Sequence, residues 1–178
     1  MKIKINPQDQ WSKIKKIYMD SFPKAERKPF FLLKHSIKRK KAVLFAFFIK
    51  EELLGFSIVI PYRDLVLVEY LAISEQARGR GAGSCLLEAI QEKYANQKIV
   101  LMIEQLDEKA ANFAQRIARK KFYQRNGFVS SPLLAQFPSG MMEIMQTGSS
   151  ISKQEWIDLQ KYALGKFFYF MSRMKVDS

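Results

Sequence analysis

A short glycine-rich stretch has residue types and spacing suited to binding an anion. Residues 78–84 read Arg-Gly-Arg-Gly-Ala-Gly-Ser and precede a run with helical spacing. Alternating glycines let the backbone turn tightly, so successive N–H groups can converge on one anion, and the following helix adds the positive end of its dipole. Arg78 and Arg80 add positive charge. The stretch therefore predicts a phosphate-binding loop.

Two common phosphate loops do not match this spacing. A Walker-type loop ends in Gly-Lys-Ser/Thr, whereas Gly83 is followed directly by Ser84. A dinucleotide fingerprint needs Gly-x-Gly-x-x-Gly directly after a strand, but here the glycines alternate and residues 74–77 intervene. A glycine-rich helix entry that binds no ligand is the remaining alternative.

The single cysteine and single histidine limit other kinds of chemistry. Cys85 alone provides neither a disulfide framework nor a thiolate cluster, and His35 alone excludes a site with two His ligands. We therefore expect no metal site. As a nucleophile Cys85 would need a base, and His35 is distant in sequence, so Cys85 is interpreted as a small packing residue.

The composition is that of an ordinary globular chain. It has 178 residues, of which 48% are hydrophobic, and no Gly/Ser linker or repeat, so we expect one domain over residues 1–178. The longest purely apolar run, residues 42–49, is too short to span a bilayer, and the N-terminus lacks the apolar block of a signal peptide. These features predict a cytoplasmic protein without a membrane span.

The net charge of +13 is the one unusual bulk property. A field of this sign attracts nucleic acid, an anionic membrane surface or a phosphorylated cofactor, and it is equally typical of a solvated basic surface. No RNA-binding motif or zinc-finger spacing accompanies the charge, so we expect no specific nucleic-acid partner.

Apolar runs rich in Val, Ile and Phe predict the strands that must position the loop. Residues 42–49 and 53–60 form a hairpin pattern, and residues 65–73 form a third run whose single charge is Glu69. A long basic helix is expected from a cap at Asp107 to Asn126-Gly127. The other expected elements are a strand at 2–5, helices at about 8–22 and from 29, a helix after the loop, strands at 99–103, about 128–134 and 141–146, and a last helix at about 152–174. This order is typical of an α/β chain with a largely antiparallel start.

These motifs together resemble the GNAT superfamily of N-acyltransferases. The family pattern Arg/Gln-x-x-Gly-x-Gly/Ala is matched at every fixed position by Arg78-Gly-Arg-Gly81-Ala-Gly83. The upstream Glu-x-Leu-Ala-Ile strand and the downstream Phe122-Tyr123-Gln-Arg-Asn-Gly127-Phe128 are also similar to family elements in the expected order. The resemblance covers residues 42 to about 145.

The resemblance implies the GNAT fold and a binding mode for acetyl-CoA (coenzyme A). The fold would be a mixed, mostly antiparallel central sheet flanked by helices and splayed at two parallel strands, here 65–73 and 99–103. The pantetheine arm would pair with the backbone of Leu71, Ala72 and Ile73, where a bulge would leave N–H groups to polarise the thioester carbonyl. The residues implied to hold the pyrophosphate are Arg78, Gly79, Arg80, Gly81, Ala82, Gly83 and Ser84.

One position departs from the family pattern. Members often carry Asn seven residues before the tyrosine, and here that residue is Arg116. The usual contact of that Asn with pantetheine is therefore not expected, and Arg116, Arg119 or Lys120 is an alternative contact for the cofactor's phosphates.

Two residues are candidates for proton transfer in amine acetylation. The resemblance assigns Tyr123 as the acid that protonates the departing thiolate; its alternative role is a core aromatic. Glu69 is the candidate base, because a carboxylate in an apolar strand should have a raised pKa. A strand carboxylate paired with Lys or Arg is the competing interpretation, and Glu104 is the second candidate base.

The function implied is direct transfer of an acetyl group from acetyl-CoA to a primary amine on a small molecule or peptide. The alternatives are a non-catalytic CoA-binding module and a basic nucleic-acid-associated module. Glu26 is a candidate contact for a cationic amine or an exposed capping residue. The last helix is expected to pack on its own domain, with a homodimer interface as the second possibility and a membrane-surface helix as the third.

Overall fold

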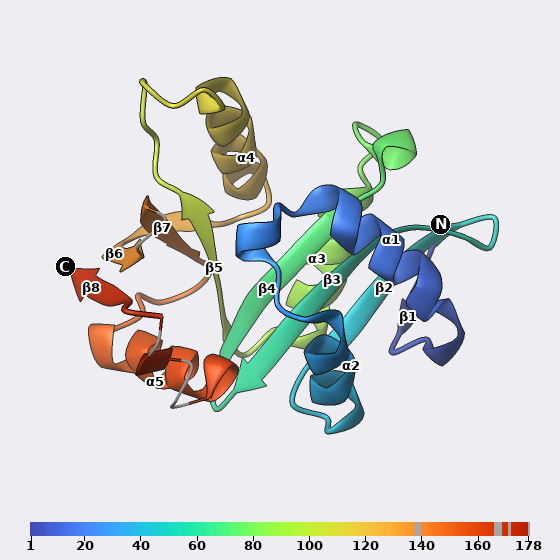
Figure 1. Cartoon of the computed structure of the whole chain (residues 1–178), viewed down its shortest axis with the longest axis horizontal. Helices are drawn as coiled ribbons and strands as arrows, with labels where there is room; N and C mark the ends of the chain where they lie inside the picture. The colour runs from blue at the N-terminus through green and yellow to red at the C-terminus, as the bar shows by residue number, and fades with distance from the viewer. Residues whose placement is uncertain (138–139, 166–168, 171, 178) are drawn as a thin grey trace. The chain divides into compact units, whose positions relative to one another are not determined.

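A computed structural model describes residues 1–137, 140–165, 169–170 and 172–177 (Figure 1). The chain divides into two compact units. The first comprises Met1–Pro61 and Val68–Ala95, and the second comprises Tyr62–Leu67 and Asn96–Ser178. The expected single domain over residues 1–178 stays a prediction. Among the described residues, the structure contains no helix with the length and apolar character of a membrane-spanning segment.

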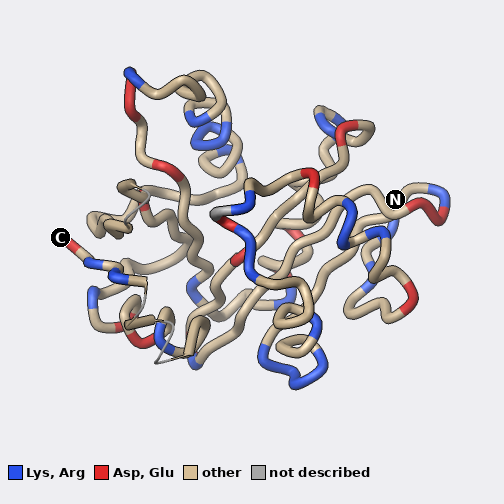
Figure 2. The backbone as a smooth tube through the Cα atoms, viewed as in Figure 1, with Lys and Arg blue, Asp and Glu red and all other residues tan. Residues whose placement is uncertain are grey.

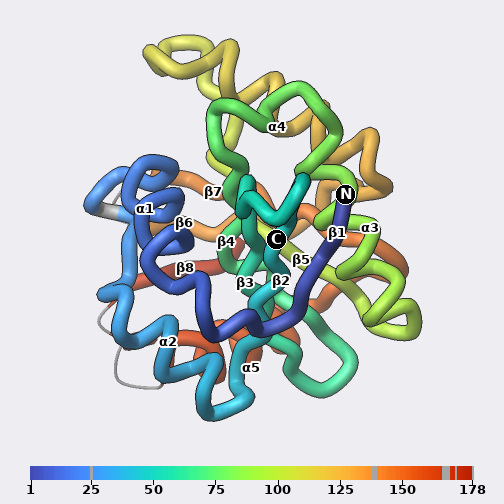
Figure 3. The backbone as a smooth tube through the Cα atoms, turned by 90° about the vertical axis from the view of Figure 1, so that its right-hand side faces the viewer, coloured from blue at the N-terminus to red at the C-terminus, as the bar shows by residue number. Residues whose placement is uncertain are grey.

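The first unit is built from four neighbouring strands with helices on both faces. Helices α1 and α2 lie on one face of these strands and α3 lies on the other (Figure 1 and Figure 3). Because both faces are covered, β2 and β3 are almost continuously apolar instead of alternating. The elements are β1 (Lys2–Ile5), α1 (Trp11–Ser21), α2 (Phe30–Lys38), β2 (Val43–Ile49), β3 (Glu52–Tyr62), β4 (Leu65–Ile73) and α3 (Ala82–Lys93). The last residue of β3 and the start of β4, Leu65–Leu67, belong to the second unit.

Short 3-10 turns precede α1 and separate other elements of the first unit. They are η1 (Gln8–Gln10), η2 (Lys24–Glu26) and η3 (Glu75–Ala77). The turn η2 lies in the loop between α1 and α2, and η3 lies directly ahead of the glycine-rich loop. The expected helix at about 8–22 is therefore a 3-10 turn followed by α1.

The second unit contains the parallel strand pair implied by the resemblance. The start of β4, Leu65–Leu67, pairs in parallel with Lys98–Val100 of β5, and this register covers only those three residues of either strand. The remaining pairs of the second unit are antiparallel. Its elements are β5 (Lys98–Glu104), α4 (Phe113–Arg125), β6 (Val129–Phe137), β7 (Gly140–Gln146), α5 (Lys153–Leu164) and β8 (Lys175–Asp177).

In the described residues the hydrogen-bonded strand order is β1-β2-β3-β4-β5-β7-β6-β8. A mixed, mostly antiparallel sheet with one parallel pair and flanking helices confirms the expected fold class. Strand β8 follows the expected last helix and was not predicted.

Two predicted helix boundaries are wrong. Asp107 does not cap the basic helix: its carboxylate accepts a hydrogen bond from the Lys109 N–H at 3.0 Å in a separate turn, and α4 begins at Phe113. The last helix does begin at a capping box, formed by Ser152 and Glu155, but α5 ends at Leu164 instead of about 174. Gly165, with φ of 83°, provides the stop. Part of the predicted range, residues 166–168 and 171, lies outside the described residues.

Candidate active site

The glycine-rich loop leads into α3 in a conformation that requires glycine. Gly79 and Gly81 have φ of 74° and 78°, and a Cβ at either position would meet nothing within 4 Å. Glycine is therefore needed for the backbone conformation and leaves open space above the loop. Gly81 precedes the first residue of α3, and among the described residues no side chain caps this helix. Its first N–H groups are thus available to an anion, which fits the expected pyrophosphate contact.

The two arginines of the loop are exposed. Arg78 makes one weak pair with Glu75, at 3.8 Å, between side chains that are 59% and 88% exposed. Such a pair contributes little stability, so the guanidinium is available to another anion. The residue types and the backbone of this loop therefore both suit a diphosphate.

The β4 residues expected to pair with pantetheine lie next to this loop. Ala72 is buried, while Leu71 and Ile73 are partly exposed. The N–H of Ser74 donates to the carbonyl of Leu54 at 2.8 Å, which fixes the end of β4 against β3. In the pairing of β2 with β3, a register shift falls between Phe47 and Phe48. The bulge expected in β4 itself stays a prediction.

Glu69 forms an ion pair whose partner could not be identified from the sequence. Its carboxylate binds the ammonium of Lys28, from the loop after η2, and the two side chains are 12% and 27% exposed. The competing interpretation, a strand carboxylate paired with a lysine, thus describes the contact that is observed. Whether Glu69 also acts as a base stays a prediction.

Two tyrosines fix the loop that carries Lys28. The hydroxyl of Tyr18 donates to the Lys28 carbonyl at 3.1 Å, and the Lys28 N–H donates to the Tyr70 hydroxyl at 3.3 Å. Tyr70 in turn donates to the Glu26 carbonyl at 3.1 Å. Burial is the main cause that raises the pKa of the Tyr70 hydroxyl, so it stays protonated at neutral pH.

Glu104, the second candidate base, lies in a network of donors in the second unit. Arg116 and Arg119 approach its carboxylate at 3.2 and 2.8 Å, and the Asn112 amide donates to it at 3.1 Å. Arg116 also donates to the Gln105 carbonyl at 2.7 Å. In this structure both arginines therefore bind a carboxylate and are not directed to a phosphate.

Tyr123, the candidate acid, lies near the end of α4. Its ring packs edge-on against Phe122 and Phe128, with centroids 5.1 and 5.7 Å away. Burial raises the pKa of Tyr123 to about 12, and the charge of Arg119 opposes this shift. In the part of the chain that the structure describes, no hydrogen bond to the hydroxyl is observed. The proton is therefore retained at neutral pH and available to an acceptor.

A family model for an acetyltransferase (GNAT) domain matches residues 40–130, just over half of the chain. The chain belongs to the GNAT acetyltransferase family. This finding confirms the resemblance based on the glycine loop and the Tyr-x-x-x-Gly-Phe segment.

One curated relative of this GNAT chain is YjbC of Bacillus subtilis strain 168, which is named as an acetyltransferase. The two are 34% identical over 67 residues, which is 38% of this chain and 32% of the relative. The match therefore spans about a third of the relative's length.

Solved structures show the same fold at low sequence identity. A GNAT-family protein of Bacteroides thetaiotaomicron superposes with a TM-score of 0.73 at 21% identity, over 95% of this chain and 98% of that one. The ribosomal-protein-S18-alanine N-acetyltransferase of Escherichia coli gives 0.64 at 15%, over 86% and 96%. A Bacillus subtilis acetyltransferase crystallised with CoA gives 0.61 at 15%, over 83% and 98%.

Basic residues of this GNAT chain are concentrated on particular elements. Figure 2 shows Lys and Arg along α4 and at the end of α2, where residues 38–41 are all basic. On α4, however, several are paired with carboxylates: besides Arg116 and Arg119, Lys120 binds Glu143 of β7 at 2.8 Å. No residue of α4 is fully buried, and these ion pairs add to the packing of Tyr123 against Phe128. This role of Glu143 was not predicted from the sequence.

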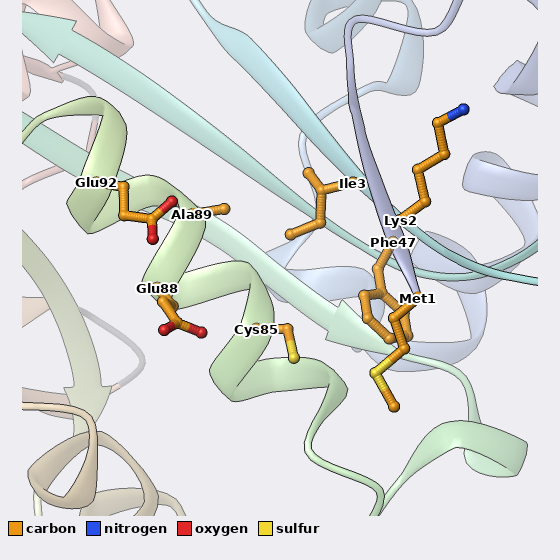
Figure 4. Close-up of a pocket in the computed structure, with 8 residues that line it drawn as sticks. All are labelled: Met1, Lys2, Ile3, Phe47, Cys85, Glu88, Ala89 and Glu92. Carbon is orange, nitrogen blue, oxygen red and sulfur yellow. The ribbon is translucent and has the colours of Figure 1, made fainter.

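A surface hollow of about 220 Å³ lies between α3 and β1 in the first unit (Figure 4). Cys85 and Ala89 line it from α3, Ile3 and Phe47 from the strands β1 and β2, and Met1 from the residue before β1. Cys85 is partly exposed there, so it is less buried than expected for a packing residue. The candidate acid, the candidate bases and the glycine-rich loop do not line this hollow.

Proposed function

We propose that this chain is an acyl-CoA-dependent N-acetyltransferase that transfers an acetyl group from acetyl-CoA directly to a primary amine. The observation that carries the proposal is the uncapped start of α3 behind Gly79 and Gly81, in a chain of the GNAT family. A GNAT structural neighbour crystallised with CoA supports the choice of cofactor.

The residues that would hold acetyl-CoA come from β4 and the loop. The backbone N–H groups of residues 79–84 and the side chains of Arg78 and Arg80 would bind the pyrophosphate. The backbone of Leu71 and Ile73 would bind the pantetheine arm. Acetyl-CoA, when bound, supplies the acetyl group as a thioester whose carbonyl carbon accepts an amine.

Glu69 is a better candidate base than Glu104. A base needs a free lone pair, and Glu104 already binds two guanidinium groups and an amide. Among the described residues Glu69 binds one ammonium, that of Lys28, which a substrate could displace. Tyr123 holds its proton at neutral pH and would deliver it to the leaving group.

The acceptor is a small-molecule or peptide amine. A cytoplasmic location and a homodimer formed through α5 both stay predictions. The single-domain organisation over residues 1–178 is also part of this proposal.

Thiol release from acetyl-CoA across a panel of primary amines tests the proposal. The panel should include polyamines, aminoglycosides, and peptides with a free N-terminus or a lysine. We expect amine-dependent release that falls by about a hundredfold in Glu69→Gln and much less in Glu104→Gln. Tight binding of acetyl-CoA without release for any amine would favour the non-catalytic CoA-binding module instead.

A further inference from the structure

The loop between α1 and α2 places a primary amine of the chain itself at the candidate base. The Lys28 ammonium contacts the Glu69 carboxylate, and the two side chains are 27% and 12% exposed. Under the proposed function, Glu69 receives the proton of the acceptor amine. The group that it binds in this structure is chemically an acceptor: a primary amine on a flexible alkyl chain.

The backbone of Lys28 is held in this position by buried groups. Its carbonyl accepts from Tyr18 and its N–H donates to Tyr70, two residues that are only 1% and 6% exposed. The two rings contact each other edge-to-face at 5.0 Å. Because the backbone is already fixed, directing the side chain to Glu69 orders only its alkyl chain. Lys24, in the same loop, is exposed instead.

A second ammonium, that of Lys41, is repelled by the Lys28 charge. The charges of Lys28 and Glu69 both act on Lys41: burial and the charge of Lys28 lower the pKa of Lys41, while the charge of Glu69 raises it. Converting Lys28 to a neutral amide would remove this repulsion between the two ammonium groups.

We propose that Lys28 is a self-acetylation site. This inference rests on the proposed function. The Lys28 Nζ gives a proton to Glu69 and forms a bond to the acetyl carbonyl carbon of acetyl-CoA. The bond between that carbon and sulfur breaks, and the thiolate leaves and takes up a proton to give free CoA. The resulting amide cannot pair with Glu69 as a cation, so the carboxylate becomes available to an external amine.

Peptide mapping by mass spectrometry after incubation with acetyl-CoA tests the site. We expect acetyl-Lys28 to form at least about tenfold faster than acetyl-Lys24, at a rate independent of protein concentration because transfer is intramolecular. The Lys28→Arg variant, which keeps the cation, should lose this modification and leave other lysines unchanged. Equal rates at Lys28 and Lys24 would overturn the inference.

The Glu69→Gln variant separates catalysed transfer from spontaneous acetylation by the thioester. If Glu69 accepts the proton, acetylation of Lys28 should fall by about a hundredfold in this variant. If the modification is spontaneous, removing the ion-pair partner favours the neutral amine and the rate should rise. A rise would therefore refute self-acetylation. Circular dichroism should confirm that the variant remains folded.

A second measurement needs no acetyl-CoA. In the protein alone, a trace amount of acetic anhydride should label Lys28 more slowly than Lys24, and Glu69→Gln should abolish this protection. Equal labelling in the wild type would show that the ion pair does not form in solution and would overturn the inference.

Two outcomes distinguish failure of self-acetylation from failure of the proposed function. Acetyl-CoA binding and amine turnover with unmodified Lys28 would refute self-acetylation alone. Absence of acetyl-CoA binding in calorimetry would refute both.

Discussion

Gly55 and Ile73 lie so close together that a side chain at position 55 has no room. A Cβ there would lie 2.6 Å from Ile73 Cδ1 and 3.0 Å from the Ala72 carbonyl oxygen. The first atom is the end of a movable side chain, but the second belongs to the β4 backbone. Gly55 thus allows β3 to approach the segment of β4 that is proposed to bind pantetheine.

We expect Gly55→Ala to weaken acetyl-CoA binding and to lower the free energy of unfolding by about 1–3 kcal/mol, the usual cost of overpacking. Calorimetry and urea unfolding measure the two effects. Adding Ile73→Val removes the Cδ1 atom and should restore part of both losses. If Ile73→Val gives no restoration, the close contact is not their cause.

Gly81→Asp should largely abolish acetyl-CoA binding in calorimetry while circular dichroism stays native. The change places a side chain and a negative charge where the pyrophosphate is expected, at a backbone φ of 78°. Gly148→Asp is a matched control, because Gly148 has φ of 74°, also with open space around a Cβ, and lies outside the loop sequence. Unchanged affinity in Gly81→Asp would refute the cofactor site.

Tyr123→Phe should reduce turnover by about a hundredfold with little change in acetyl-CoA affinity, because it removes the hydroxyl and keeps the ring packing. The raised pKa, about 12, keeps this hydroxyl protonated below that pH, so Tyr123 should cause no loss of turnover up to about pH 10. Tyr94→Phe, at another tyrosine whose pKa is raised by burial, is the control. Wild-type turnover of Tyr123→Phe, with chemistry rate-limiting, would make Tyr123 only a packing residue.

Glu155 should make stability depend on pH in the acid range. Hydrogen bonds from Lys98 and from the Ser152 cap lower the pKa of Glu155 from 4.5 to about 2. Because the pKa is depressed in the folded state, this stabilisation is complete above pH 4.5 and is lost as the pH falls toward 2. We expect about 1–2 kcal/mol, allowing for a carboxylate that is 32% exposed.

Urea unfolding of the wild type and of Glu155→Gln between pH 7 and 2.5 measures this contribution. The difference between them should shrink on acidification, whereas exposed Glu88, changed to Gln, should show little difference at any pH. A difference that stays constant down to the lowest pH would contradict the assignment to Glu155.

The sequence was sufficient to predict those features that depend on interactions between residues close together in the chain. The apolar run at residues 65–73 coincides with β4, and the glycines of the loop adopt the positive φ angles that only glycine takes easily. The spacing between the loop and Tyr123 was also sufficient to identify the family. Gly165 could have predicted the end of α5, because glycine is typical after a helix, but the expected helix extended past it to about residue 174.

Only the tertiary structure decided which charged groups meet. Lys28 and Glu69 are 41 residues apart, and nothing in either local pattern selects one of 30 Lys and Arg side chains as the partner. Glu104 likewise pairs with two arginines because α4 packs against β5. Periodicity and turn propensity arise from interactions within a few residues, so they are visible in the sequence. An ion pair between distant segments depends on how strands and loops pack, and this packing determined the surroundings of both candidate bases.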